Sequence, residues 1–261
     1  MHNIYYQLQL SNTSDNSKEI VFIGDSFTWG QGLYLDYWKE NRPELFEKFY
    51  ANTIENETHL QWIDQQEFIG KEEMIIKDNL SFTNKVGESL GRKVYKKKYN
   101  GGSITSNRQL LENFYKLESE KRDVILIFQF TSLGREDFGI ITDEEFSRYN
   151  LLIHRPDSVV REILKDRIYS IYKSIDSIID NLETELGWRC YYLDWLGDFS
   201  EFDEKNRFIG IDDNTSFFNL VLNNPIKIEY KDKIFYDYHL NRKGNIILAE
   251  SILKKINLEN S

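Results

Sequence analysis

Four runs along the chain have the apolar and polar pattern of β-strands. EIVFIG (19–24) is continuous and rich in β-branched residues, as expected of a strand buried on both faces. DVILIFQF (123–130) is the most apolar of the four. The other two expected strands are RKVYKKKY (92–99) and WRCYYLDW (188–195).

Amphipathic runs between and after these strands predict helices. Apolar residues recur at helical spacing over 82–91, 106–118, 158–187 and 241–256. Gly91 is expected to end the first of these helices. Ser106 and Gln109 have capping-box spacing at the start of the second, and Asn241 is the expected N-cap of the last.

Alternating strands and helices predict an α/β fold, in which a mostly parallel sheet is covered by helices on both faces. In such sheets, binding and catalytic sites lie at the carboxyl ends of the strands. Ser26, Gly102 and Thr131 each follow a predicted strand. We therefore expect these three residues to lie along one edge of the sheet.

Three long stretches do not fit this repeat: about 33–80, 132–157 and 196–235. We interpret them as insertions in a single domain spanning 1–261, because the chain has no internal repeat and no long linker. Long insertions on an α/β core often surround the active site. Their many aromatic residues predict either packing of the insertions onto the domain or a surface that stacks on a sugar ring, and we expect packing for most of them.

Composition narrows the class of partner. The chain has 261 residues, 40% hydrophobic and 29% charged, which is typical of a globular protein with a substantial core. Its net charge of -10 argues against nucleic-acid partners, because no surplus of Lys and Arg exists to neutralise phosphates. We interpret the one dense basic run, KVYKKK (93–98), as a solvated strand edge or loop.

A single cysteine, Cys190, rules out an intramolecular disulfide and a multi-cysteine zinc site, and we expect it to be a small buried thiol. No motif predicts a metal or a nucleotide cofactor. No apolar run approaches the ~20 residues of a membrane helix, and no secretory signal is seen at the start. We therefore expect a cytoplasmic protein with no membrane partner, with release by lysis or in a virus particle left open.

The tripeptide Gly-Asp-Ser at 24–26 places a serine directly after the first long strand. A serine nucleophile needs a general base, usually histidine, and that histidine needs an acceptor on its other nitrogen. Of the four histidines only His239 combines a nearby acid, Asp237, with a defined place before the last helix. The other three lie in the N-terminal tail or in the insertions: His2, His59 and His154. We expect Asp25 to fix the turn through local hydrogen bonds rather than to react.

The order of these motifs resembles that of the SGNH, or GDSL, hydrolases. GDS follows the first strand, NGGS the second and FTS the third, and Asp-x-His precedes the last helix. The resemblance implies a three-layer α/β/α sandwich of flavodoxin-like type, with a mostly parallel five-stranded sheet. It also implies that Ser26 attacks an ester carbonyl, that His239 takes the serine proton, and that Asp237 orients His239.

The resemblance further implies an oxyanion site. Its donors would be the Ser26 backbone N–H, the Gly102 N–H and a side chain at the place of Thr131. Gly101 is the alternative to Gly102, and Ser132 is the alternative to Thr131. The sequence departs from the family here, because the usual asparagine donor is absent. The acid also lies two residues before the histidine, whereas the family often has it three before.

Two further residues are candidates for substrate binding. Trp29 follows Ser26 closely, and Arg135 follows the third strand. Arg135 could hold an anionic or polar group of the substrate, or it could pair with its acidic neighbours Glu136 and Asp137.

Together these patterns predict a serine esterase for small acyl esters, with a carbohydrate O-acetyl group as the first choice of substrate. An O-acyltransferase with the same triad is one alternative, since a sugar hydroxyl can replace water in the second step. A non-catalytic carbohydrate-binding or structural module on a hydrolase fold is the other.

Overall fold

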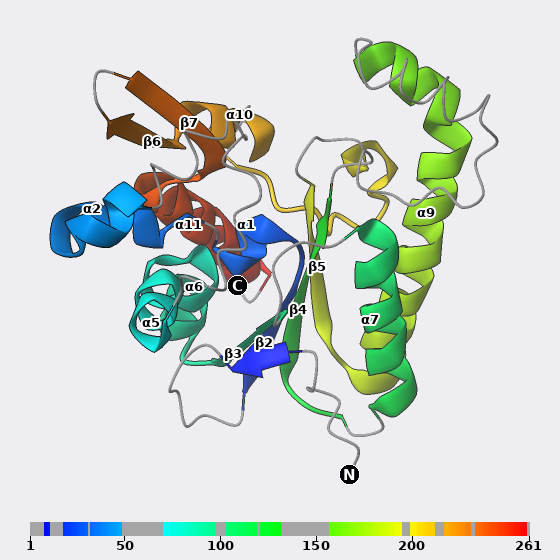
Figure 1. The fold of residues 1–261 in the computed structure, drawn as a ribbon. Coiled ribbons are helices and arrows are strands. Elements are labelled where there is room, and N and C mark those ends of the chain that lie inside the picture. The colour runs from blue at the N-terminus through cyan, green and yellow to red at the C-terminus, as the bar shows by residue number, and fades with distance from the viewer. Residues whose placement is uncertain are drawn as a thin grey trace.

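The computed structural model describes residues 8–10, 18–30, 32–48, 70–97, 103–118, 121–131, 157–194, 199–211, 217–230 and 233–259. They form an α/β fold around a mostly parallel sheet (Figure 1). The sheet has the order β1-β3-β2-β4-β5, with strands β1 (Leu8–Leu10), β2 (Glu19–Ile23), β3 (Lys93–Lys97), β4 (Val124–Phe130) and β5 (Arg189–Asp194). Strands β2 to β5 pair in parallel, and β1 pairs antiparallel with β3.

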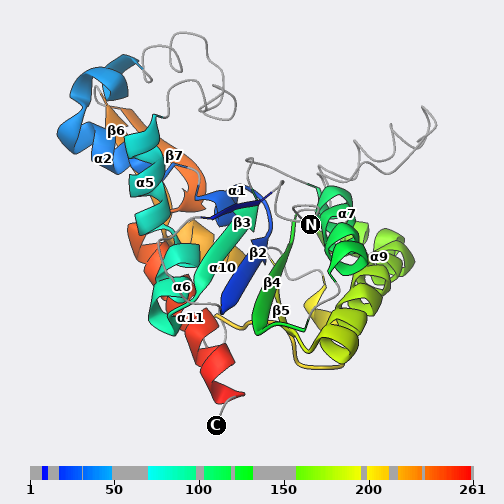
Figure 2. The ribbon, with the colours of Figure 1, turned by 90° about the horizontal axis from the view of Figure 1, so that it is seen from below.

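Helices cover both faces of the sheet, an arrangement consistent with a three-layer α/β/α fold (Figure 2). One face carries α6 (Phe82–Leu90) and α11 (Arg242–Leu258), and the other carries α7 (Ile104–Leu117) and α9 (Asp157–Leu186). The position of β2 between these two helix layers explains why its sequence is continuously apolar. Ile20 and Phe22 pack in the core on the α6 and α11 side, whereas Val21 and Ile23 pack on the other.

The helix ends agree with the sequence at most places. Gly91 ends α6 in the left-handed conformation, with a φ of 61°. Asn241 caps α11, and its side chain accepts a hydrogen bond from the Gly244 N–H at 2.9 Å. The predicted cap of α7 is wrong. Its N-cap is Ser103, whose hydroxyl accepts from the Ser106 N–H while the Ser106 hydroxyl accepts from the Ser103 N–H, so the helix begins at Ile104.

The intervals expected to be insertions contain regular elements. These are α2 (Tyr34–Asn41), α5 (Lys71–Leu80), the short 3-10 helix η3 (Ser200–Phe202), α10 (Phe217–Asn223), and the antiparallel hairpin β6 (Pro225–Tyr230) and β7 (Lys233–Leu240). Several of their aromatic side chains are buried, among them Tyr34, Trp38 and Phe46. Packing rather than sugar stacking therefore explains these three.

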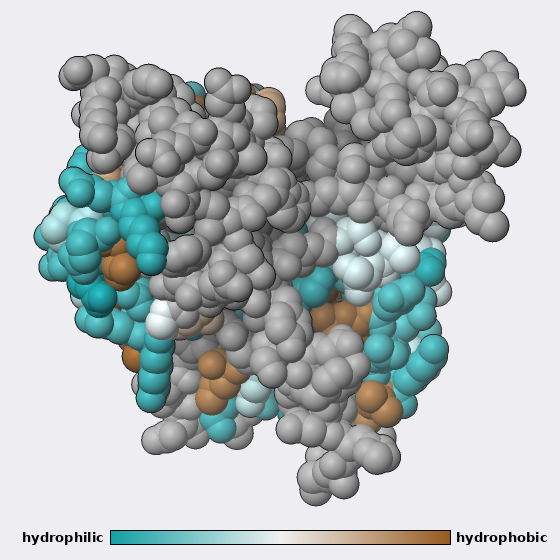
Figure 3. All heavy atoms as spheres, viewed as in Figure 1, coloured by the Kyte–Doolittle hydropathy of each residue, from teal (hydrophilic) through white to brown (hydrophobic). Residues whose placement is uncertain are grey.

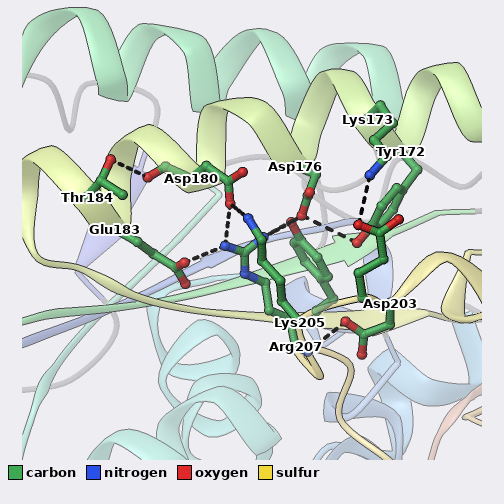
Figure 4. Close-up of polar contacts among 11 residues, drawn as sticks. Tyr172, Lys173, Asp176, Asp180, Glu183, Thr184, Asp203, Lys205 and Arg207 are labelled. Atoms are coloured by element: carbon green, nitrogen blue, oxygen red, sulfur yellow. Dashed lines mark hydrogen bonds and ion pairs between the residues drawn. The ribbon is translucent and has the colours of Figure 1, made fainter.

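Arg207 joins the segment 199–211 to α9. Its side chain is 5% exposed and pairs with carboxylates on successive turns of that helix, Asp176, Asp180 and Glu183 (Figure 4). Three partners compensate the cost of burying one guanidinium. Beside it, Phe208 forms a parallel bridge with Tyr192 of β5, so this segment lies along the sheet at its β5 edge.

The described residues on one face of the molecule are mostly polar (Figure 3). On the face displayed in Figure 3, hydrophilic residues gather over the outer helices, with hydrophobic residues scattered among them. Exposed large hydrophobic side chains, such as Ile75 and Leu117, lie on different helices. Within the described ranges, no helix is both long and apolar enough to cross a membrane.

The interpretation of KVYKKK as a solvated strand edge is wrong. Strand β3 lies between β1 and β2, and the Lys96 side chain is 0% exposed. Its Nζ donates to the Asp78 carboxylate at 2.5 Å, and the Nζ of buried Lys77 lies 3.2 Å from the same oxygen. Helix α5 supplies both Lys77 and Asp78. The Asp78 carboxylate of this helix compensates the burial of Lys96 on the sheet. Burial, reinforced by the charge of Lys96, lowers the pKa of Lys77 to about 7.

Lys77→Met is expected to change how stability depends on pH. The folded-state pKa lies below that of the unfolded chain, so Lys77 binds more protons unfolded than folded between about pH 7 and 10. Below pH 7 the charged Lys77 therefore lowers the free energy of unfolding by its full amount. As pH rises above 7, this loss shrinks by up to about 1.4 kcal/mol per pH unit.

We expect the variant to gain most over wild type in Tm at pH 6 to 7, with the gain shrinking toward pH 9.5. Thermal unfolding measured across this range tests the expectation. Lys71→Met, at an exposed lysine of the same helix, is the control and should follow the wild-type pH dependence. A Tm difference between Lys77→Met and wild type that is constant with pH would contradict the expectation.

Candidate active site

The turn after β2 is stabilised by a hydrogen bond between its own residues. The chain passes through Gly24 and Asp25, and the short helix α1 (Ser26–Trp29) begins at the carboxyl edge of the sheet. Asp25 is buried, and its Oδ1 accepts a hydrogen bond from the Phe27 N–H at 3.1 Å, which confirms its predicted role in fixing the turn. A Cβ at Gly24 would lie 2.1 Å from the Thr28 hydroxyl, so glycine is required there.

Gln129 is a site residue that the sequence analysis missed. It is 1% exposed, on β4, and its Nε2 donates to Asp25 Oδ1 at 2.7 Å. Its Oε1 accepts from the Thr28 hydroxyl at 2.6 Å. One carboxamide thus ties β4 to both ends of the 25–28 turn. The sequence signal that could have identified Gln129 is that it is a single polar residue inside the most apolar strand.

His239 lies against the residue that follows Ser26. It is the next-to-last residue of β7 and lies two residues before Asn241, the cap of α11, at the strand-to-helix junction that the sequence predicted. Its half-buried ring packs on the ring of Phe27, with centroids 4.9 Å apart. Phe217 of α10 packs on Phe27 as well, at 5.4 Å. The structure therefore brings the last strand to the start of α1, from the opposite end of the chain.

Asn245 supports the junction between β7 and α11. It is buried, and its side chain donates to the carbonyls of Leu240 and Asn241 at 2.9 and 3.1 Å. Its oxygen accepts from the Phe82 N–H at 2.9 Å, at the start of α6. The backbone next to His239 is thus fixed to two helices.

Thr131 follows β4 at the same edge, as predicted. The residue is 2% exposed, and its hydroxyl has no hydrogen-bond partner in the described part of the chain. A buried hydroxyl without a partner costs free energy, unless a ligand supplies the missing partner.

A cation, Lys97, also lies at this edge, at the end of β3. Its Nζ donates to the Asn107 side-chain oxygen at 3.0 Å. Burial lowers the pKa of Lys97, and attraction by the Asp25 carboxylate opposes this shift. Lys97 therefore adds positive charge near the turn that carries Ser26.

Several predicted residues lie outside the described part of the structure. These are Gly101, Gly102, Ser132 and Arg135, together with the side chains of Ser26, Trp29 and Asp237. The backbone of Asp237 is on β7, where it pairs with Ile226. Of the expected constellation, the structure thus brings together the Ser26 backbone, the His239 ring and, at the end of the strand beside β2, Thr131.

The opposite, amino edge of the sheet has a cavity of about 470 Å³. Lys18, Arg92 and Arg189 line it, and all three lie within ion-pair distance of Asp123. Arg92 is buried and also donates to the Glu19 and Asp123 carbonyls. This cluster joins the starts of the parallel strands.

Cys190 is buried, as predicted, and burial raises the pKa of its thiol. In the described ranges, no group of three or more His, Cys, Asp or Glu side chains could hold a metal ion.

Comparisons with known proteins do not identify a family. No family model matches the chain, and no curated protein or solved structure is significantly similar to it.

Proposed function

We propose that the chain is a serine esterase of the SGNH, or GDSL, type. The order of its parallel strands supports this proposal. If the four parallel strands β2, β3, β4 and β5 are numbered 1 to 4 in chain order, they lie across the sheet in the order 2-1-3-4, as in flavodoxin-like sheets. Ser26 begins α1 at the carboxyl end of β2, the first of these strands in the chain, and such folds hold their sites at this edge of the sheet.

The contact between His239 and Phe27 carries the proposal. A general base must lie within hydrogen-bond reach of the nucleophile, directly or through one water. The His239 ring packs on the residue next to Ser26, although the two are near opposite ends of the chain. No other described residue of the chain is a histidine.

In the proposed reaction, Ser26 Oγ attacks the ester carbonyl while His239 takes its proton. The alcohol leaves with that proton, and an acyl-enzyme remains. His239 then activates a water molecule, which releases the acid and restores the serine. Asp237 orients His239. The Ser26 N–H, the Gly102 N–H and the Thr131 hydroxyl stabilise the oxyanion. The Thr131 hydroxyl has no partner among the described residues, which supports its place in this set.

We propose small acyl esters as substrates, with O-acetyl groups of carbohydrates as the first choice. Trp29 and Arg135 are the proposed substrate contacts. The reaction needs no cofactor and no metal, since the triad supplies both nucleophile and proton transfer.

The wild-type protein is expected to hydrolyse p-nitrophenyl acetate in preference to p-nitrophenyl octanoate. We expect kcat/KM for the acetate to be about tenfold higher or more, because a pocket shaped for a short acyl group excludes added methylenes. Nitrophenol release measures both rates, and acetate release from acetylated oligosaccharides tests the alcohol part. A preference for the octanoate would contradict the proposed substrate class. Acetyl transfer to an added sugar, faster than hydrolysis, would favour the acyltransferase.

A further inference from the structure

We infer that Gln129 is a positioning residue, which sets the distance between two donors of the oxyanion site. This inference rests on the proposed esterase function. One donor, the Ser26 N–H, belongs to the turn after β2, and the other, the Thr131 hydroxyl, follows β4. Gln129 is the side chain that bonds the end of β4 to that turn.

The contacts of Gln129 use both ends of its carboxamide. The Nε2 donates to Asp25 on one side of Ser26, and the Oε1 accepts from Thr28 on the other. Asp25 Oδ1 also accepts from the Phe27 N–H, so one carboxylate oxygen holds Gln129 and the backbone beside Ser26 together. All three side chains in this set are buried: Asp25, Thr28 and Gln129.

Burial gives these bonds their effect. In a buried network each hydrogen bond is stronger than in water, and removing one partner leaves another polar group unsatisfied. The turn therefore has one favourable position relative to β4. Since Thr131 is two residues beyond Gln129 on the same strand end, a shift of the turn would change the separation of the two donors.

Oxyanion stabilisation depends steeply on such separations. Donors must lie 2.7–3.1 Å from the developing charge, and a misplacement of about 1 Å can cost about 100-fold in rate. The Gln129 carboxamide donates to a carboxylate and accepts from a hydroxyl without carrying charge. A carboxylate at position 129 would instead oppose that of Asp25 unless it held a proton.

Two variants test the inference. Gln129→Met should lower kcat for p-nitrophenyl acetate by about 10- to 100-fold and leave KM within about threefold, because only transition-state contacts are weakened. In Gln129→Glu the introduced carboxyl can donate to Asp25 only when protonated. Its kcat relative to wild type should therefore rise as pH falls from 8 to 6, and Gln129→Met should show no such rise.

Controls separate positioning from general destabilisation. Gln109→Met, at an exposed glutamine of α7, should match wild type. Thr28→Val removes one of the two bonds and should lower kcat several-fold, which keeps the test open if the Gln129 variants do not fold. The amide proton shift of Phe27, which reports the turn directly, should move in Gln129→Met.

The possible results are distinguishable. Folded Gln129→Met with kcat within twofold of wild type, or a Gln129→Glu ratio that is flat with pH, overturns the inference and leaves the esterase proposal standing. An unchanged Phe27 amide shift overturns it independently of activity. Wild type that neither turns over an ester nor reacts with a fluorophosphonate removes the proposed function, and this inference with it.

Discussion

Ser26→Ala is expected to lower kcat/KM for p-nitrophenyl acetate by about 10⁴-fold or more, since loss of the nucleophile leaves only the contribution of the oxyanion site and substrate binding. The turn that holds this residue is fixed by Asp25 and Gln129 through neighbouring groups, so the variant should fold as wild type does. Initial rates of nitrophenol release, with Tm measured in parallel, give the comparison.

Ser170→Ala is the matched control, because Ser170 is exposed on α9 on the far face of the sheet. It should hydrolyse the ester at the wild-type rate. Folded Ser26→Ala that keeps more than a tenth of the wild-type rate would mean that another group attacks the ester.

His239→Ala is expected to produce the second large loss, about 10³- to 10⁶-fold in kcat, because the serine then has no general base. KM should change little, since the ring acts on the proton in the transition state rather than on substrate binding. The variant also removes the ring contact with Phe27, so its Tm must be measured beside its rate. Steady-state kinetics at pH 7.5 separate kcat from KM.

His154→Ala tests whether the loss is specific to one histidine. His154 lies in a different interval of the chain, and its variant should stay within about twofold of wild type. Equal losses in the two variants would contradict the assignment of His239, and a loss confined to His154→Ala would transfer the base to that residue.

The sequence predicted those elements whose cause is local. A continuously apolar run such as EIVFIG must be buried on both faces, and it forms β2 between two helix layers. Asn241 and Gly91 mark helix ends because their own backbone and side-chain chemistry decides those ends. The place of His239 followed from the same local logic.

What the sequence did not predict depends on distant partners. Lys96 looked solvated, because neither β1 nor the Asp78 carboxylate of α5 can be inferred from the run KVYKKK itself. Gln129 bonds to residues about a hundred positions away, and no spacing rule connects them. The cap of α7 was misplaced by three residues because two serines with the same spacing to a polar residue compete there.

Reaction with a fluorophosphonate, followed by peptide mass mapping, tests the central claim most directly. A serine activated by a neighbouring base forms a stable covalent adduct with this reagent, whichever ester the enzyme uses. We predict one adduct per chain, on the peptide that contains Ser26, and its loss in both Ser26→Ala and His239→Ala. Folded wild type without an adduct, or with the adduct on another residue, would contradict the proposed serine esterase.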